Sequence, residues 1–242
     1  MSGHSHWHGI RHKKAITDAK RASVFTKFGK LITIAAKDGG GDVSMNVRLR
    51  LLVDQARSAN MPKENIERAI KRGTGELKEG GDIQEIVYEG LIPVSAGQIS
   101  LMILVATDNK NRAVSEIKTF LKKSGGQMVP NGSVGYLFDN VGIIELSQDQ
   151  VVSQEDLEMI IIDAGASDIE IRDDVIIVYT EIKNLKTTQE NLVKKNISIL
   201  SSTIGYRSTQ KISLSDEEYS RYETLLEQFD EQEDVQNIYD NI

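Results

Sequence analysis

Residues 141–206 alternate between short apolar runs and helical periods, and their order constrains the fold more than any other feature of the sequence. The order is strand, helix, strand, strand, helix, strand, which is that of a split-βαβ or ferredoxin-like domain. Val175–Tyr179 is apolar on both faces, as expected of a strand that is covered on both sides. We predict strands near residues 141–146, 168–172, 174–180 and 199–206, and helices near 153–164 and 185–195.

A second unit of this kind begins earlier in the chain and is incomplete there. Ile99–Ala106 predicts a strand, and a helix and a short strand follow it. The C-terminal segment supplies the missing helix, which opens on the capping box Ser215-x-x-Glu218, and a last strand. We therefore predict that one α/β domain is inserted into another. The predicted domains are residues 79–133 plus 208–242 and, inserted between these two segments, residues 134–207.

The first third of the chain has a helical period instead. Val24, Phe28 and Leu31 recur at i, i+4 and i+7 and form one apolar stripe. Helices are predicted at about 18–37, at about 43–59 and from Pro62 to Gly73. Residues 1–78 thus predict a basic arm followed by a three-helix domain. The predicted fold class is α+β, a small N-terminal helical bundle followed by two ferredoxin-like α/β domains, the last inserted into the middle one.

Charge is distributed unevenly along the chain. Residues 1–75 contain 15 Lys and Arg but 6 Asp and Glu, a net charge of +9. Residues 76–242 contain 14 Lys and Arg but 30 Asp and Glu, a net charge of −16. The overall charge of −7 therefore hides the difference between the two parts. Such asymmetry indicates a module that binds a polyanion, attached to an acidic body. The alternative is that the two parts attract each other, and this attraction can coexist with binding as autoinhibition.

The basic third contains the candidate binding residues. Lysine and arginine neutralise phosphates and release counterions, which provides much of the affinity for nucleic acid. Trp7 lies among four histidines, and an aromatic ring beside positive charge suits base stacking. A solvated basic face without a ligand is the alternative. The candidate nucleic-acid-binding residues are His4, Trp7, Arg11, His12, Lys13, Lys14, Lys20, Arg21, Lys27, Lys30, Arg48, Arg50, Lys63, Arg68, Lys71 and Arg72. Lys13, Lys14, Lys20 and Lys27 are predicted to lie at the surface.

A secondary phosphate site is predicted at the start of the helix after Ile99–Ala106. Helix N-terminal amides bind anions, and Asn109, Lys110 and Arg112 lie at this position. The alternative is that Asp108 or Asn109 caps the helix.

Several classes of function are excluded or left unsupported. The chain has no cysteine, which excludes disulfides, thiolate metal sites and cysteine nucleophiles. All four histidines lie in the first twelve residues, so a folded body without histidine does not suggest a serine-type catalytic site. We predict no enzyme activity, no cofactor, no metal site and no small-molecule substrate. One hypothesis of metal binding stays open, because Ser2-Gly3-His4 would chelate Cu(II) or Ni(II) after removal of Met1.

Membrane association is not predicted either. The longest apolar run, Leu101–Ala106, is too short to span a bilayer. The first 25 residues lack the apolar region of a secretory signal. We predict a cytoplasmic protein.

Several motifs along the whole chain resemble those of the YebC/PmpR family. The motifs are Gly3-His4-Ser5-x-Trp7, Asp18-Ala19-Lys20-Arg21, Asn60-Met61-Pro62-Lys63, Tyr88-Glu89-Gly90, Thr107-Asp108-Asn109, Gly132-Ser133-Val134 and Asp234-Val235-Gln236-Asn237-x-Tyr239. The resemblance implies a three-domain cytoplasmic protein, described as a probable transcriptional regulator that binds DNA. Related mitochondrial proteins are similar to translational activators, and bacterial relatives are tied to the ribosome. The chain departs from the family at Leu91–Gly97, where the pattern has a Pro-Gly-Gly turn.

Three functions follow as hypotheses. The first is a non-enzymatic, DNA-binding regulator of transcription. The second is a translation factor that uses the same basic residues on ribosomal RNA. The third is a protein-interaction scaffold whose acidic domains are the working surface.

Overall fold

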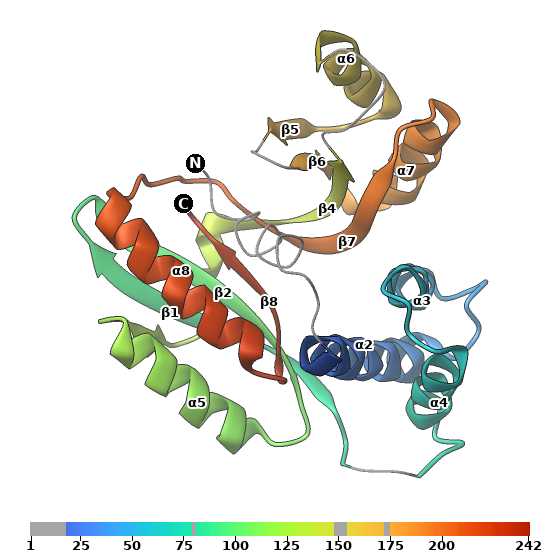
Figure 1. The fold of residues 1–242 in the computed structure, drawn as a ribbon, viewed down its shortest axis with the longest axis horizontal. Helices are drawn as coiled ribbons and strands as arrows, with labels where there is room; N and C mark the ends of the chain where they lie inside the picture. Colours follow the sequence, from blue (N-terminus) through green and yellow to red (C-terminus); the bar gives the residue numbers. More distant parts are fainter. Residues whose placement is uncertain (1–17, 79–80, 148–153, 172–174) are drawn as a thin grey trace.

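The described residues form a bundle of three helices, α2 to α4, and two four-stranded sheets, each covered by two helices (Figure 1). The computed structural model describes residues 18–78, 81–147, 154–171 and 175–242. The α-helices are α2 (Asp18–Gly39), α3 (Val47–Ser58), α4 (Lys63–Thr74), α5 (Lys110–Lys123), α6 (Gln154–Ala164), α7 (Leu185–Lys194) and α8 (Asp216–Glu231). The strands are β1 (Gln84–Val94), β2 (Gly97–Thr107), β3 (Gln127–Val129), β4 (Phe138–Ser147), β5 (Asp168–Ile171), β6 (Val175–Thr180), β7 (Ile199–Ser208) and β8 (Val235–Asp240).

The helices α2, α3 and α4 form the predicted bundle around one apolar core. The second helix begins at Val47, four residues later than predicted. The side chain of Asn46 fixes this start, because its oxygen accepts from the backbone N of Leu49 at 3.0 Å. Its amide donates to the carbonyl oxygens of Ala35 and Gly40, at 2.8 and 2.9 Å. One side chain therefore ties the end of α2 to the beginning of α3.

The first sheet has the strand order β3-β1-β2-β8, and all its strands are antiparallel. The C-terminal strand β8 pairs with β2, so residues 130 or more positions apart are neighbours in one sheet, as Leu101↔Asp240 illustrates. Helices α5 and α8 cover one face (Figure 1), where Leu101, Ile117 and Phe229 lie in the same core. The inserted arrangement predicted from the sequence is thus observed in the sheet, while the domain boundaries stay a prediction.

Strand β1 is an element that the sequence analysis did not predict. It forms a long hairpin with β2, from Gln84↔Thr107 to Val94↔Gly97. The segment that departs from the family pattern is the end of this strand and its turn. Glu89 in its middle is buried, and its carboxylate accepts from the backbone N of Val134 at 2.6 Å. A charge in the centre of the segment concealed the strand pattern.

The second sheet has the order β5-β6-β4-β7, which is that of a ferredoxin-like fold with its six elements in the predicted sequence. Helices α6 and α7 cover one face, and Ile144, Leu157 and Leu192 lie in their common core. The observed strand β4 begins at Phe138, three residues earlier than predicted. The predicted fold class is confirmed.

The faces of the two sheets that their helices leave open pack against each other. Met102 and Tyr239 of the first sheet share a core with Ile143 and Tyr179 of the second. The bundle adjoins both sheets, because α2 contacts β2 through Ile34 and Ala106, and the Gln55 amide of α3 donates to the Ser202 carbonyl of β7 at 2.7 Å. The three parts therefore meet at one junction. Over the residues described, no helix combines the length and apolarity needed to cross a membrane.

Candidate nucleic-acid interface

One basic face of α2 is turned toward the corner between α8 and β8. The Nζ of Lys27 donates to the carbonyl oxygen of Asp230 at 2.8 Å and lies 3.5 Å from its Oδ1. The Nζ of Lys30 lies 2.6 Å from Asp234 Oδ1 and donates to the Glu233 carbonyl at 3.0 Å. We call residues 230–234 the acidic corner. The basic bundle and the acidic body thus attract each other, as one of the sequence-based alternatives proposed.

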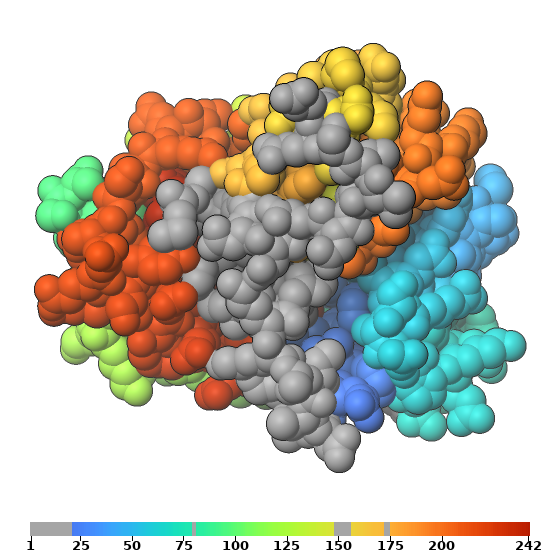
Figure 2. Space-filling view, turned by 45° about the horizontal axis from the view of Figure 1, so that its top comes forward, coloured from blue at the N-terminus to red at the C-terminus, as the bar shows by residue number. Residues whose placement is uncertain are grey.

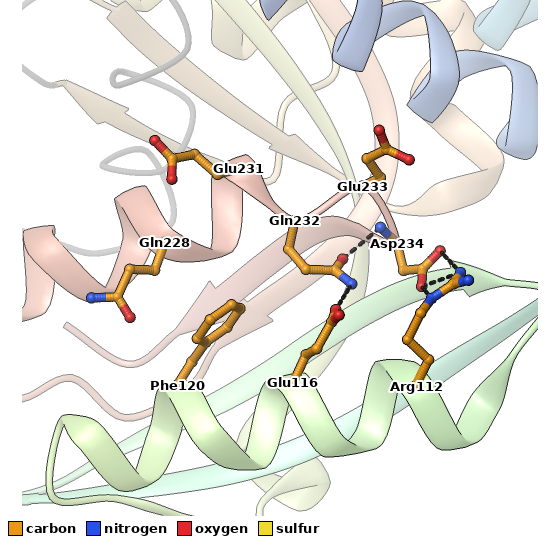
Figure 3. Close-up of a pocket in the computed structure, with 8 residues that line it drawn as sticks. All are labelled: Arg112, Glu116, Phe120, Gln228, Glu231, Gln232, Glu233 and Asp234. Atoms are coloured by element: carbon orange, nitrogen blue, oxygen red, sulfur yellow. Dashed lines mark hydrogen bonds and ion pairs between the residues drawn. The ribbon is translucent and has the colours of Figure 1, made fainter.

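Asp234 is the centre of this contact. Its side chain is only 2% exposed and also accepts from Arg112 NH2 of α5 at 2.9 Å (Figure 3). Burial alone would raise the pKa of Asp234, but the hydrogen bonds from Lys30 and Arg112 outweigh it and lower the pKa. The carboxylate is therefore ionised at neutral pH and joins α2, α5 and β8.

A groove of about 500 Å³ lies beside Asp234, between α5 and the end of α8. Figure 3 shows Gln232 between Asp234 and Glu116, and Phe120 on the α5 side of the groove. Glu231 and Glu233 also line it, so its carboxylates outnumber its single cation, Arg112. This charge disfavours phosphate.

The surface position predicted for Lys27 is wrong. Its exposed fraction is 3%, because the acidic corner covers it. The helical period placed Lys27 correctly beside the apolar stripe, but it carried no information about a partner 203 residues away. Lys30 is half-buried for the same reason.

Three further cations of the bundle hold the fold together. Arg48 NH2 lies 2.5 Å from Glu85 Oε1 of β1. Arg50 donates to the carbonyl oxygens of Val43 and Ser44, at 3.1 and 2.7 Å, and Arg72 donates to that of Gly81 at 3.0 Å. Each of these predicted binding residues therefore has a structural partner.

Among the candidate residues of the bundle, the exposed cations are Arg21 on α2 and Lys63, Arg68 and Lys71 on α4. Arg68 and Lys71 are exposed on α4 and have no ion-pair partner among the described residues. Lys63 is 84% exposed and only loosely paired with Glu67, at 3.5 Å. Figure 2 shows α3 and α4 in cyan at the outer edge of the molecule, away from α8. We define the α4 basic surface as Arg57, Lys63, Arg68, Lys71 and Lys78.

Two members of this surface, Arg57 and Lys78, were not predicted from the sequence. Arg57 is 64% exposed at the end of α3, where it flanks the same short turn as Lys63, and Lys78 is exposed beyond α4. Both residues lie at or just beyond the end of a helix in the sequence, and this position could have indicated that they are exposed. Arg21 is also exposed, at the start of α2.

The predicted phosphate site at α5 is occupied by the protein itself. The side chain of Asn109 accepts from the backbone N of Arg112 at 3.1 Å, so the capping alternative is confirmed. The Arg112 guanidinium is held by Asp234 and lies 3.3 Å from Asp108. Lys110 is exposed there and has no ion-pair partner among the described residues.

The arm lies outside the described residues, and so do its predicted contacts. These are His4, Trp7, Arg11, His12, Lys13 and Lys14, together with the side chain of Lys20. The hypothesis of a copper or nickel site at His4 also falls there. In the part of the chain that the structure describes, no group of three or more His, Asp or Glu side chains is placed to hold a metal ion.

Comparison with known proteins identifies relatives of the whole chain. Residues 5–76 match the family model described as the TACO1/YebC protein N-terminal domain, and residues 83–242 match the model of the TACO1/YebC second and third domain. The chain belongs to the TACO1/YebC family. Its helical bundle and its two sheets therefore correspond to the family's N-terminal part and to its second and third domains.

Similar members of the TACO1/YebC family share the full length. A protein of Thermotoga maritima is 43% identical over 242 residues, which are 100% of this chain and 93% of the relative. One of Thermoanaerobacter pseudethanolicus is 40% identical over 100% of this chain and 97% of its own. Both are named "Probable transcriptional regulatory protein". The crystal structure of the conserved hypothetical protein Aq1575 from Aquifex aeolicus is 39% identical, with a TM-score of 0.88 over 98% of this chain and 96% of that one.

Proposed function

We propose that this TACO1/YebC protein is a cytoplasmic, non-enzymatic regulator of gene expression that binds DNA through its α4 basic surface and its N-terminal arm. The observation that carries the proposal is the contrast within the bundle. Lys27, Lys30 and Arg48 are held by carboxylates, whereas Arg68 and Lys71 are open to solvent. Open cations release counterions from a phosphate backbone when they bind it. The regulator names of the relatives support the same class of function.

RNA is the second candidate ligand, and the small number of open cations favours it. Glu64 and Glu67 lie on the exposed side of α4 among the lysines and arginines. Under this alternative, the two carboxylates reduce the attraction of the surface for a lone duplex, and the ligand is an RNA that a larger particle such as the ribosome presents together with other contacts. Under this alternative the protein regulates translation.

The test is a salt titration of binding by the full chain. Fluorescence anisotropy with a DNA duplex and with a ribosomal RNA hairpin gives log affinity against log salt concentration. For duplex DNA, each phosphate contact that is lost reduces the slope by ~0.9. We expect the variant R68E/K71E to lose affinity and slope, and K122E/K123E to keep both. Lys122 and Lys123 are exposed on α5, and this control makes the same change of charge.

Equal affinity of R68E/K71E and the wild type for both probes would overturn the proposal. Weak binding to the duplex, combined with sedimentation of the protein with intact ribosomes, would decide for RNA. Strong binding to the duplex that falls steeply with salt would decide for DNA.

A further inference from the structure

A cavity of about 360 Å³ lies at the junction of the bundle and the two sheets. Helices α2 and α3 form one side, strands β1, β2 and β8 of the first sheet a second, and strands β4 and β7 of the second sheet a third. The volume is in the range of pockets that hold small ligands. It is distinct from the α4 basic surface and from the groove beside Asp234.

Part of the cavity wall is aliphatic. Leu31, Leu51, Val87 and Leu104 line it, and each is only half-buried although it lies between three packed parts of the protein. Aliphatic side chains that line a cavity favour an apolar ligand surface. The wall therefore fits a ligand with an apolar body.

The charges in the lining cancel. Of the described residues that line the cavity, only Arg48 and Glu85 carry a charge. Their side chains form an ion pair, with 2.5 Å between Arg48 NH2 and Glu85 Oε1. A phosphate would need an unpaired cation, and a metal ion would need several carboxylates. The paired lining disfavours both and selects an uncharged ligand.

The remaining polar groups of the wall are amides and phenols. Asn237 donates to the hydroxyl of Tyr239 at 3.2 Å, and its buried Oδ1 accepts no hydrogen bond from any described residue. Gln55 and Asn140 also line the cavity. The rings of Tyr206 and Tyr239 lie edge to face, with centroids 5.4 Å apart. Amides pair with the donor and acceptor edges of bases, and an aromatic ring stacks on their faces. Tyr239 is only 1% exposed, so the half-buried ring of Tyr206 is the one that can contact a base.

We propose that this junction cavity binds one nucleobase. The required ligand is an uncharged, planar ring with a polar edge, and a nucleobase combines these properties. The base comes either from an unstacked residue of a bound nucleic acid or from a free nucleoside. If the base belongs to a bound nucleic acid, the cavity site rests on the proposed function. The protein then contacts a base in addition to the phosphates.

The experiment uses the full chain and two kinds of probe. Adenosine, guanosine, cytidine and uridine are titrated by NMR, with methyl signals of Val87 and Leu104 as reporters, and a single-stranded oligonucleotide is titrated by anisotropy. We expect intermolecular Overhauser contacts from at least one nucleoside to these methyl groups. We expect V87F, which fills the cavity, to abolish them and to weaken oligonucleotide binding about tenfold, equivalent to ~1.4 kcal/mol. V193F, at a residue 57% exposed on α7, is the matched control.

The outcomes separate this proposal from the proposed function. Nucleoside contacts that V87F removes and R68E/K71E keeps support the cavity site, and if no oligonucleotide binds, the source is a free nucleoside. Absence of contacts from all four nucleosides in the wild type, together with wild-type oligonucleotide affinity in V87F, would overturn the site, even where R68E/K71E still impairs binding. The wild-type Overhauser experiment decides the question if V87F fails to fold.

Discussion

Helices α2 and α4 both carry several lysines or arginines, but their cations have opposite surroundings. On α2, Lys27 is 3% exposed and Lys30 lies against Asp234, so both serve the contact between the bundle and the C-terminal segment. On α4, Arg68 and Lys71 face solvent. The net charge of +9 over residues 1–75 therefore overstates the charge available to a ligand. The comparison predicts that substitutions on α2 change stability, and that substitutions on α4 change binding.

The largest effect is expected at the acidic corner. D234A leaves Lys30 and Arg112 without their shared carboxylate, and we expect a loss of about 2–3 kcal/mol in the free energy of unfolding. This is below the ~3–5 kcal/mol of a broken, fully buried pair, because Arg112 is 48% exposed. Urea unfolding measures it. The control E233A removes an exposed carboxylate and keeps the backbone carbonyl that binds Lys30, so it is expected to match the wild type.

The next prediction contrasts the two helices directly. We expect R68E/K71E to lower nucleic-acid affinity about tenfold or more, ~1.4 kcal/mol, with an unchanged free energy of unfolding. K27M should do the reverse, with a loss of about 1–2 kcal/mol in stability from its buried hydrogen bonds and an unchanged affinity. Anisotropy and urea unfolding on both variants measure this contrast. A loss of affinity in K27M without loss of stability would contradict the division between the two helices.

A smaller effect is expected at the start of α5. N109A removes the side chain that caps the helix and should lower the free energy of unfolding by ~1 kcal/mol. Since Asn109 and Arg112 are engaged within the protein, nucleic-acid affinity should not change. A fall in affinity with unchanged stability would instead restore the phosphate site predicted from the sequence.

The smallest effect is expected for Glu218 in acid. Hydrogen bonds from the backbone N of Ser95 and of Ser215 lower the pKa of Glu218 from 4.5 to about 2. A carboxyl whose pKa is lower in the folded state contributes stability above its unfolded value and loses it as the pH falls. E218Q should therefore be less stable than the wild type at pH 6, and this difference should shrink between pH 4.5 and 2. Thermal unfolding at several pH values measures it, and a difference independent of pH would exclude this linkage.

Much of the fold could be predicted because local patterns determine it. The six elements of the second sheet and the three helices of the bundle each follow a regular apolar period. Strand β1 was not predicted, because Glu89 and Pro93 interrupt its apolar pattern. The buried Glu89 carboxylate is stabilised by the backbone N–H groups of Gly132, Val134 and Gly135, and this partner loop lies 43–46 residues away.

The candidate site was less predictable, for a related reason. The sequence identifies which residues are charged, but the pairing of Lys27 with Asp230 depends on contacts across 203 residues. Arg68 and Lys71 were predicted to bind nucleic acid, and both are exposed in the structure, because their positions on α4 oppose the buried Ile66 and Ala69. The local helical period determines which cations are exposed, whereas tertiary contacts determine which of them are paired with a carboxylate.

The position of the acidic corner near the C-terminal end has a consequence for the newborn protein. A chain is synthesised from its N-terminus, and its early segments fold first. The lysines of α2 are made about 200 residues before Asp230 and Asp234, and β2 is made long before its neighbour β8. While the polypeptide is being made, the cations of α2 therefore face the surroundings without these carboxylates. The basic surface becomes restricted only after residues 230–234 have been made and have folded against α2.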